Sequence, residues 1–122
     1  MIVLDEQLND PSHIKAINRW YSGSVITIND VRPSTQIHDD VIAALLHHLK
    51  SPIFVTINYT DFWRKIPAHR NYCVICLKLS SERKKEVPIV LRELLSLEQF
   101  NTSRKLMGKV ISVSEGVVRY YE

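Results

Sequence analysis

Acidic side chains with the chemistry of metal ligands stand after two expected strands and at the start of an expected helix. These residues and the amide beside them are Asp5, Asp39, Asp40, Asn58 and Asp61. In open α/β sheets, ligands bind beyond the carboxyl ends of the strands. We therefore expect these residues, which come from distant parts of the chain, to meet at one edge of a sheet.

Carboxylates that lie close together repel one another, and a hard divalent cation relieves this repulsion. Mg²⁺ and Mn²⁺ accept one or two carboxylates, keep several waters and bridge to phosphate oxygens. An acidic cleft formed by Asp5, Asp39, Asp40 and Asp61 is suited to metal-assisted hydrolysis of a phosphodiester. A purely structural interpretation stays open, because either member of the Asp39–Asp40 pair can instead cap its helix.

Other kinds of site lack their sequence signals. The chain has neither a G-x-x-x-x-G-K-[ST] nor a G-x-G-x-x-G motif, and its three glycines are too few for a loop that surrounds phosphate groups. Cys73 and Cys76 lie three apart in an expected strand, so they should point to opposite faces as buried core residues. His13, His47 and His48 are expected at the surface or partly buried rather than on a metal.

Positive charge near the acids could hold a nucleic acid. Sixteen Lys and Arg against thirteen Asp and Glu give a net charge of +3 and a pI near 9.0, a mild excess that permits such binding without requiring it. The residues expected to contact a substrate are Arg32, Arg64, Lys65 and Arg70. Phe62 and Trp63 fit two roles, stacking on single-stranded bases or packing that anchors the loop.

The first half of the chain alternates between strands and helices. Residues 1–4 form an expected strand, and a helix follows with Asp10 as its N-cap and Pro11 in its first turn, ending at Gly23. Residues 24–28 are a second strand, and residues 29–35 a turn-rich loop. A second helix opens at Asp39–Asp40 and stops at Ser51–Pro52, before the apolar strand that ends at Asn58.

The second half continues the pattern and closes with a hairpin. A basic connection precedes a strand over residues 72–79, and a charged link leads to a helix that starts near Pro88. Alternating segments flank Glu115–Gly116, the spacing of a tight antiparallel hairpin. No linker or repeat divides the chain. Residues 1–122 are therefore expected to form a single three-layer α/β/α domain with a mostly parallel sheet.

Location and assembly follow only coarsely. No apolar run approaches the ~20 residues of a membrane span, and Met1 leads into Ile2-Val3-Leu4 without a basic flank, so we expect a cytoplasmic protein without membrane contact. Apolar residues of the first two helices could form either a homodimer interface or a groove for a partner protein. The sequence leaves both open.

Three stretches, in order, match the motifs of a known family. Leu4-Asp5-Glu6-Gln7-Leu8 matches a strand ending in D-E-N-L, and Val55 to Phe62 resembles V-T-x-D-x-D-F. Between them, Val25-Ile26-Thr27 leads through Val31-Arg32-Pro33 to a helix start that resembles S-D-x-E-I-L. The chain thus resembles, over nearly its whole length, the small PIN-like proteins that are predicted nucleases of toxin-antitoxin systems and relatives of VapC-type PIN ribonucleases.

This resemblance implies a PIN-like fold and Mg²⁺-dependent cleavage of RNA by a toxin that pairs with an antitoxin protein. The implied ligands of Mg²⁺ or Mn²⁺ are Asp5, Asp39 or Asp40, and Asp61, with Asn58 nearby. The chain departs from the family where two acids usually stand one residue apart, because it has Asn58 and Asp61 with two residues between them. An asparagine can still bind a hard cation through its carbonyl oxygen, with one negative charge fewer.

Two other functions compete with the ribonuclease hypothesis. A PIN-like domain that has lost an acid could act by binding protein or RNA without turnover. A receiver-like signalling domain also groups acids at strand ends, with an acidic pair after the first strand, a phosphoacceptor after the third and a lysine near the fifth. Asp5–Glu6 and Asp61 match the first two features, but no Lys-Pro pair follows the strand over residues 72–79.

Overall fold

A mixed sheet lies at the centre of the computed structural model, which describes residues 1–31 and 41–122. These residues contribute six strands in the order β2-β1-β3-β4-β5-β6. The strands are β1 (Ile2–Leu4), β2 (Val25–Thr27), β3 (Ile53–Thr56), β4 (Cys73–Leu77), β5 (Val110–Ser114) and β6 (Val117–Tyr121). β1 to β5 are parallel and β6 pairs antiparallel with β5, which confirms the predicted mostly parallel α/β sheet with an antiparallel end.

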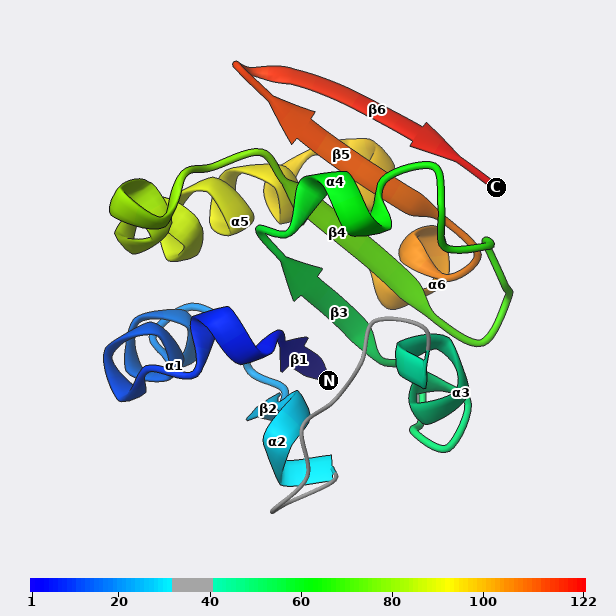
Figure 1. Cartoon of the computed structure of the whole chain (residues 1–122), viewed down its shortest axis with the longest axis horizontal. Coiled ribbons are helices and arrows are strands. Elements are labelled where there is room, and N and C mark those ends of the chain that lie inside the picture. The colour runs from blue at the N-terminus through cyan, green and yellow to red at the C-terminus, as the bar shows by residue number, and fades with distance from the viewer. Residues whose placement is uncertain (32–40) are drawn as a thin grey trace.

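Helices cover both faces of this sheet (Figure 1). One face carries α1 (Pro11–Asn18), α5 (Val87–Ser96) and α6 (Ser103–Leu106), together with the 3-10 turns η1 (Glu6–Leu8), η3 (Ser81–Glu86) and η4 (Glu98–Phe100). The other face carries α2 (Ile28–Val31), α3 (Ile42–Leu46) and α4 (Tyr59–Phe62). The described residues therefore form three layers, helices, sheet and helices.

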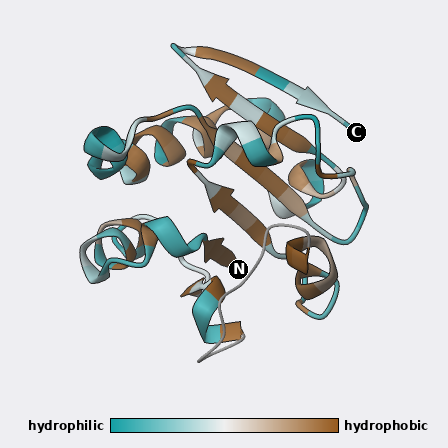
Figure 2. Cartoon of the chain, viewed as in Figure 1, coloured by the Kyte–Doolittle hydropathy of each residue, from teal (hydrophilic) through white to brown (hydrophobic). Residues whose placement is uncertain are grey.

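The central strands β1, β3 and β4 are almost wholly apolar because both of their faces are buried (Figure 2). Successive side chains alternate between two cores, so Cys73 packs among the residues under α1 and α5 while Cys76 packs under α3 and α4. Both thiols are free, and burial raises the pKa of Cys76 to about 12 and that of Cys73 still further. The prediction of two core cysteines on opposite faces is confirmed.

The first helix begins where the sequence predicts and ends earlier. Asp10 is its N-cap, accepting hydrogen bonds from the backbone N–H and the hydroxyl of Ser12, both at 2.8 Å, and Pro11 fills the first turn. The helix ends at Asn18 instead of Gly23. Beyond it, the Tyr21 hydroxyl accepts a 2.8 Å hydrogen bond from the Met1 amino group, so this segment ties down the start of β1.

Two short helices stand where the sequence predicted loop. In α2 the Asp30 carboxylate accepts a hydrogen bond from the Thr27 backbone N–H at 2.9 Å, the reciprocal half of a capping box. In α4 the pair at the same spacing is Asn58 and Asp61. The T-x-x-D and N-x-x-D spacings are the sequence signals for these helix starts.

The hairpin between β5 and β6 has the predicted two-residue turn. Ser114 pairs with Val117, and the two residues between them both have positive φ, 51° at Glu115 and 77° at Gly116. This is the backbone of a type I′ turn, in which glycine fits the second position without strain and asparagine is favoured over glutamate at the first.

Glu115→Asn is expected to stabilise the protein by about 0.5 kcal/mol or more, because it completes the preferred Asn-Gly turn. The melting temperature should rise by about 2 °C or more, measured by circular dichroism. Glu115→Val is the contrasting variant, since a β-branched residue resists positive φ and should lower the melting temperature. Equal melting temperatures in both variants would show that this turn conformation contributes nothing.

Large exposed apolar side chains lie on α5 and its C-terminal end and on β6, at Ile89, Leu97, Val117 and Tyr120. The sequence predicts a homodimer interface or a partner groove on the apolar residues of the first two helices. Among the described residues, α1 and α3 carry none of these large exposed apolar side chains. Within residues 1–31 and 41–122, no helix has the length and apolar character needed to cross a bilayer.

Candidate functional site

The carboxyl ends of β1 and β3 form the switch point of the sheet. These two strands are neighbours in parallel register, with Leu4 opposite Val55, as the sequence predicted. The chain passes from β1 to β2 on one side and then to β3 on the other, with α1 and α3 on opposite faces. Open α/β sheets bind ligands in the crevice at such a reversal. Asp5 and the segment after β3 meet there.

Asp5 is buried at this point, with 5% of its surface exposed. Its backbone N–H donates to the Val55 carbonyl at 3.0 Å, which fixes its position at the end of β1. Its carboxylate accepts hydrogen bonds from the Glu6 backbone N–H at 2.8 Å and from the Thr56 hydroxyl at 2.6 Å. Burial nevertheless raises the pKa of Asp5, because these two bonds offset only part of the desolvation of its charge.

Thr56 joins Asp5 to the residues after β3. Its fully buried hydroxyl donates to Asp5 Oδ2 and accepts a hydrogen bond from the Asn58 backbone N–H at 2.9 Å. The Asn58 side-chain amide in turn donates to Asp61 Oδ2 at 2.9 Å. A continuous series of hydrogen bonds therefore runs from Asp5 through Thr56 and Asn58 to Asp61.

The spacing between Asn58 and Asp61 has a structural reason. Asn58 is the residue before α4, and Asp61 lies in the first turn of that helix. Residues three apart on a helix lie on the same side, so two intervening residues bring these side chains together. Two acids one residue apart, as in the resembling family, would need a different backbone here.

The other predicted acids, Asp39 and Asp40, lie outside the described residues, and so does Arg32. Within residues 1–31 and 41–122, no three His, Cys, Asp or Glu side chains come together as a metal-binding group. The structure thus places Asp5, Asn58 and Asp61 of the predicted set at one edge of the sheet.

The donors at this edge suit a hard divalent cation. Asp5 and Asp61 offer carboxylate oxygens and Asn58 offers an amide oxygen, the ligands that Mg²⁺ and Mn²⁺ prefer. The raised pKa of Asp5 adds a physical reason, because a cation would offset the desolvation of its charge. The residues present therefore fit such an ion.

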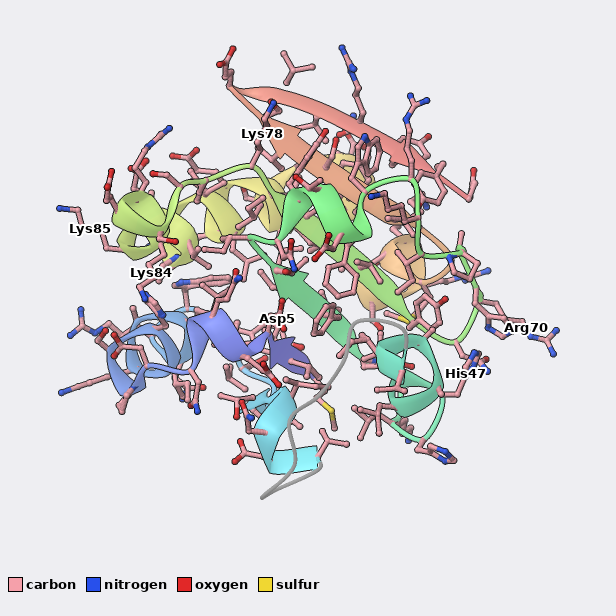
Figure 3. The ribbon with its side chains drawn as sticks, viewed as in Figure 1. Asp5, His47, Arg70, Lys78, Lys84 and Lys85 are labelled. Atoms are coloured by element: carbon pink, nitrogen blue, oxygen red, sulfur yellow. The ribbon has the colours of Figure 1, made fainter. Side chains whose placement is uncertain are left out.

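The predicted cationic residues divide between two parts of the molecule. Arg64 follows α4, where its guanidinium carbon lies 5.7 Å from the centre of the Trp63 ring, and Lys65 beside it is exposed. Arg70 lies beside Gly108 in the loops that enter β4 and β5, at the amino end of the sheet. Figure 3 shows Arg70 next to His47 and far from Asp5, so the structure does not bring Arg70 to the acidic edge.

Of the two aromatic residues after Asp61, Phe62 is a packing residue, whereas Trp63 is only partly covered. Phe62 is buried in the core beneath α4, and half-buried Trp63 lies 5.2 Å from the Tyr121 ring, between centroids. His13 is buried, with Nδ1 at 3.3 Å from the Leu8 carbonyl oxygen. Exposed His47 stacks edge-on against His69 at the amino end of the sheet.

Sequence reasoning missed Thr56 and Lys78. Thr56 is the polar residue at the end of the otherwise apolar β3, and this position was the available signal. Lys78 follows β4 at the same edge and lines an open hollow of about 480 Å³ together with Asn58, Tyr59 and Ser80. Another groove, beside Trp20 and Arg92, lies at the opposite, amino end of the sheet and does not include these residues.

Comparison of the chain with protein-family models, with curated proteins and with solved structures found no match.

Proposed function

We propose that the protein is a metal-dependent ribonuclease whose acidic site lies at the carboxyl ends of β1 and β3. The observation that supports this most is the buried carboxylate of Asp5 at the switch point, joined by hydrogen bonds through Thr56 and Asn58 to Asp61. The motif resemblance to PIN-like proteins supplies the substrate class, and the mild basic charge of the chain is compatible with it.

In this proposal two side chains bind the cation and two others orient them. Asp5 and Asp61 bind the cation, Thr56 fixes the rotamer of Asp5, and the Asn58 side chain fixes that of Asp61. Asp39 or Asp40 is the expected further carboxylate. A divalent cation bound there would lower the pKa of an attacking water and stabilise the charge that develops on the phosphate.

The direct test is cleavage of a single-stranded RNA by the purified full-length chain. We expect cleavage with Mg²⁺ or Mn²⁺ and none in EDTA, with activity restored when metal is added back in excess. Equal cleavage in EDTA would contradict the proposal, because the acidic site has no role without a cation.

A toxin role is proposed on the motif resemblance. A ribonuclease that acts on cellular RNA should arrest the growth of its host when expressed alone, and a dedicated antitoxin protein should relieve the arrest. Growth arrest that persists when Asp5 is replaced would show that the effect does not come from this site.

A binding protein without turnover is the second candidate. It is favoured by Asn58 standing where the resembling family has an acid, and by the two hydrogen bonds that already satisfy Asp5 without a metal. RNA binding that is unchanged by metal, with no cleavage, would support this candidate over the ribonuclease.

A receiver-like signalling domain is the third candidate, because the strand order β2-β1-β3-β4-β5 is that of flavodoxin-like sheets. The residue at the end of β3 is Thr56, and Asp61 lies a helical turn later, hydrogen-bonded to Asn58. A receiver carries its lysine near the fifth strand. Here Lys78 follows β4, whereas β5 ends at Ser114 and leads into the hairpin turn. These positions favour the ribonuclease over phosphate transfer to an aspartate.

A further inference from the structure

Three adjoining hollows lead away from the acidic edge along β5, β6 and α4. The first contains Asn58, Tyr59 and Lys78, and the second shares Tyr59 and Lys78 with it. The second hollow, of about 280 Å³, shares Arg119 with the third, which is lined by Trp63, Arg64 and Tyr121. Because each hollow shares residues with the next, they form one continuous surface that starts beside Asn58.

Aromatic rings follow one another along this surface. Tyr59 is the first residue of α4 and Trp63 follows its last; their ring centroids are 6.1 Å apart, and the Trp63 centroid is 5.2 Å from that of Tyr121 in β6. The Tyr121 hydroxyl donates a hydrogen bond to the Ile66 carbonyl, which holds this ring in place. Burial raises the pKa of Tyr121 to about 12, so the hydroxyl keeps its proton at neutral pH. The rings therefore form an ordered row.

Cations alternate with these rings. The Lys78 ammonium lies 5.5 Å from the centre of the Tyr59 ring and the Arg64 guanidinium carbon 5.7 Å from that of Trp63, while exposed Arg119 lies between them on β6. Among the described residues, none of these three cations has a carboxylate within ion-pairing distance. Glu115, in the hairpin turn, is the acid among the described residues that line the three hollows.

We propose that this surface binds the backbone and bases of a single-stranded RNA on its way to the acidic site. We call it the basic-aromatic track, made of Tyr59, Trp63, Arg64, Lys78, Arg119 and Tyr121. A groove of cations that follows a phosphate backbone, combined with rings on which bases stack, is the chemistry of single-strand binding without sequence preference. The RNA assignment rests on the proposed ribonuclease function, whereas the track itself rests on the contacts described above.

The strands give the track its dimensions. From Ser114 to Val110, β5 rises about 13 Å, and Lys78 lies beside one end of this stretch while Tyr121 pairs with the other. A probe of about ten nucleotides therefore extends beyond both ends of the track.

The test is fluorescence anisotropy with a fluorescein-labelled single-stranded RNA of this length, using the full chain in EDTA so that no cleavage occurs. The double variant Lys78→Gln/Arg119→Gln removes two track cations and keeps most of their side-chain length. Its dissociation constant should rise about tenfold or more, and the slope of log K against log salt should become about 1.4 shallower.

Lys50→Gln/Arg70→Gln is the matched control, because it removes the same charge from exposed residues of loops at the amino end of the sheet. Its affinity should stay within about twofold of the wild type. Tyr59→Leu should weaken binding about fivefold or more without changing the salt slope, since it removes stacking and no charge. Glu115→Asn should tighten binding, since it removes the acid beside the track.

Three results would overturn the track. The first is equal weakening by the two double variants, which would show that overall charge holds the RNA. The second is binding of duplex RNA as tight as that of the single strand. The third is competition by polyglutamate as effective as competition by RNA, which would make this an acidic-peptide surface. Because binding is measured in EDTA, a working track without metal-dependent cleavage would separate this inference from the proposed ribonuclease.

Discussion

Asp5→Asn is expected to reduce Mg²⁺-dependent RNA cleavage more than about a hundredfold. Replacing groups that only orient metal ligands already costs about 10- to 100-fold in metal affinity or activity, so loss of a ligand should cost at least as much. Asparagine has the same shape as aspartate, and its oxygen can still accept the Glu6 backbone N–H that Asp5 accepts at 2.8 Å. The rate of cleavage of a labelled RNA by the two proteins gives the comparison.

The fold of this variant should be intact, and its pH dependence provides the control. The pKa of Asp5 is raised by burial, so the folded protein binds this proton more tightly than the unfolded chain does. The protonated acid therefore adds stability below about pH 4, which is lost as the pH rises through the raised pKa. Without metal, wild type should lose stability relative to Asp5→Asn over that pH range. An inactive variant that is also unfolded at neutral pH would contradict this account of Asp5.

Thr56→Val is expected to lower both stability and cleavage. Valine keeps the shape but removes the hydroxyl that donates to Asp5 at 2.6 Å and accepts from the Asn58 backbone N–H at 2.9 Å. Leaving the buried Asp5 oxygen without its donor costs about 1–3 kcal/mol of unfolding free energy. Loss of the group that orients Asp5 should cost about 10- to 100-fold in cleavage. Urea unfolding and single-turnover cleavage measure the two effects.

A pH profile distinguishes positioning of Asp5 from general destabilisation. The Thr56 hydrogen bond lowers the pKa of Asp5, so its loss should raise that pKa further and move the rise of cleavage with pH to higher values. Thr102→Val is the matched control, because the Thr102 hydroxyl caps α6 by accepting the Lys105 backbone N–H at 3.2 Å, far along the chain from Asp5. It should cost about 1 kcal/mol and leave the pH profile unchanged. Identical profiles for both variants would exclude a positioning role for Thr56.

Much of the fold follows from local sequence. Strands buried on both faces are recognisable as short apolar runs. The Glu115–Gly116 pair indicates the hairpin between β5 and β6, because a type I′ turn needs positive φ at both positions. The neighbouring positions of β1 and β3 follow from the alternation of strands and helices. The adjacency of Asp5 to the segment after β3 was therefore predictable.

The details of the site depend on register, which local sequence does not contain. Thr56 reaches Asp5 because Leu4 pairs with Val55, and a shift by one residue would point Thr56 to the other face. The helix that brings Asp61 to Asn58 has four residues and was too short for a periodic signal. The N-x-x-D spacing was the sequence signal that could have predicted this helix.

Arg70, which the sequence grouped with the residues around the acidic edge, lies away from that edge for a topological reason. In a parallel sheet, a connection leaves a strand at its carboxyl end and must return to the amino end of the next strand. Arg70 comes just before β4, so it lies at the amino end with His69 and Tyr72. Lys78 follows β4 and lies at the carboxyl end, where the same rule would have placed it.

The central claim is that Asp5 and the pair Asn58–Asp61 hold a divalent cation together. Isothermal titration of the metal-free protein with Mn²⁺ tests it most directly, with Asp5→Asn as the comparison. We predict saturable binding at or below millimolar Mn²⁺ that is lost in Asp5→Asn. The absence of saturable binding at millimolar Mn²⁺, or equal binding by both proteins, would contradict it.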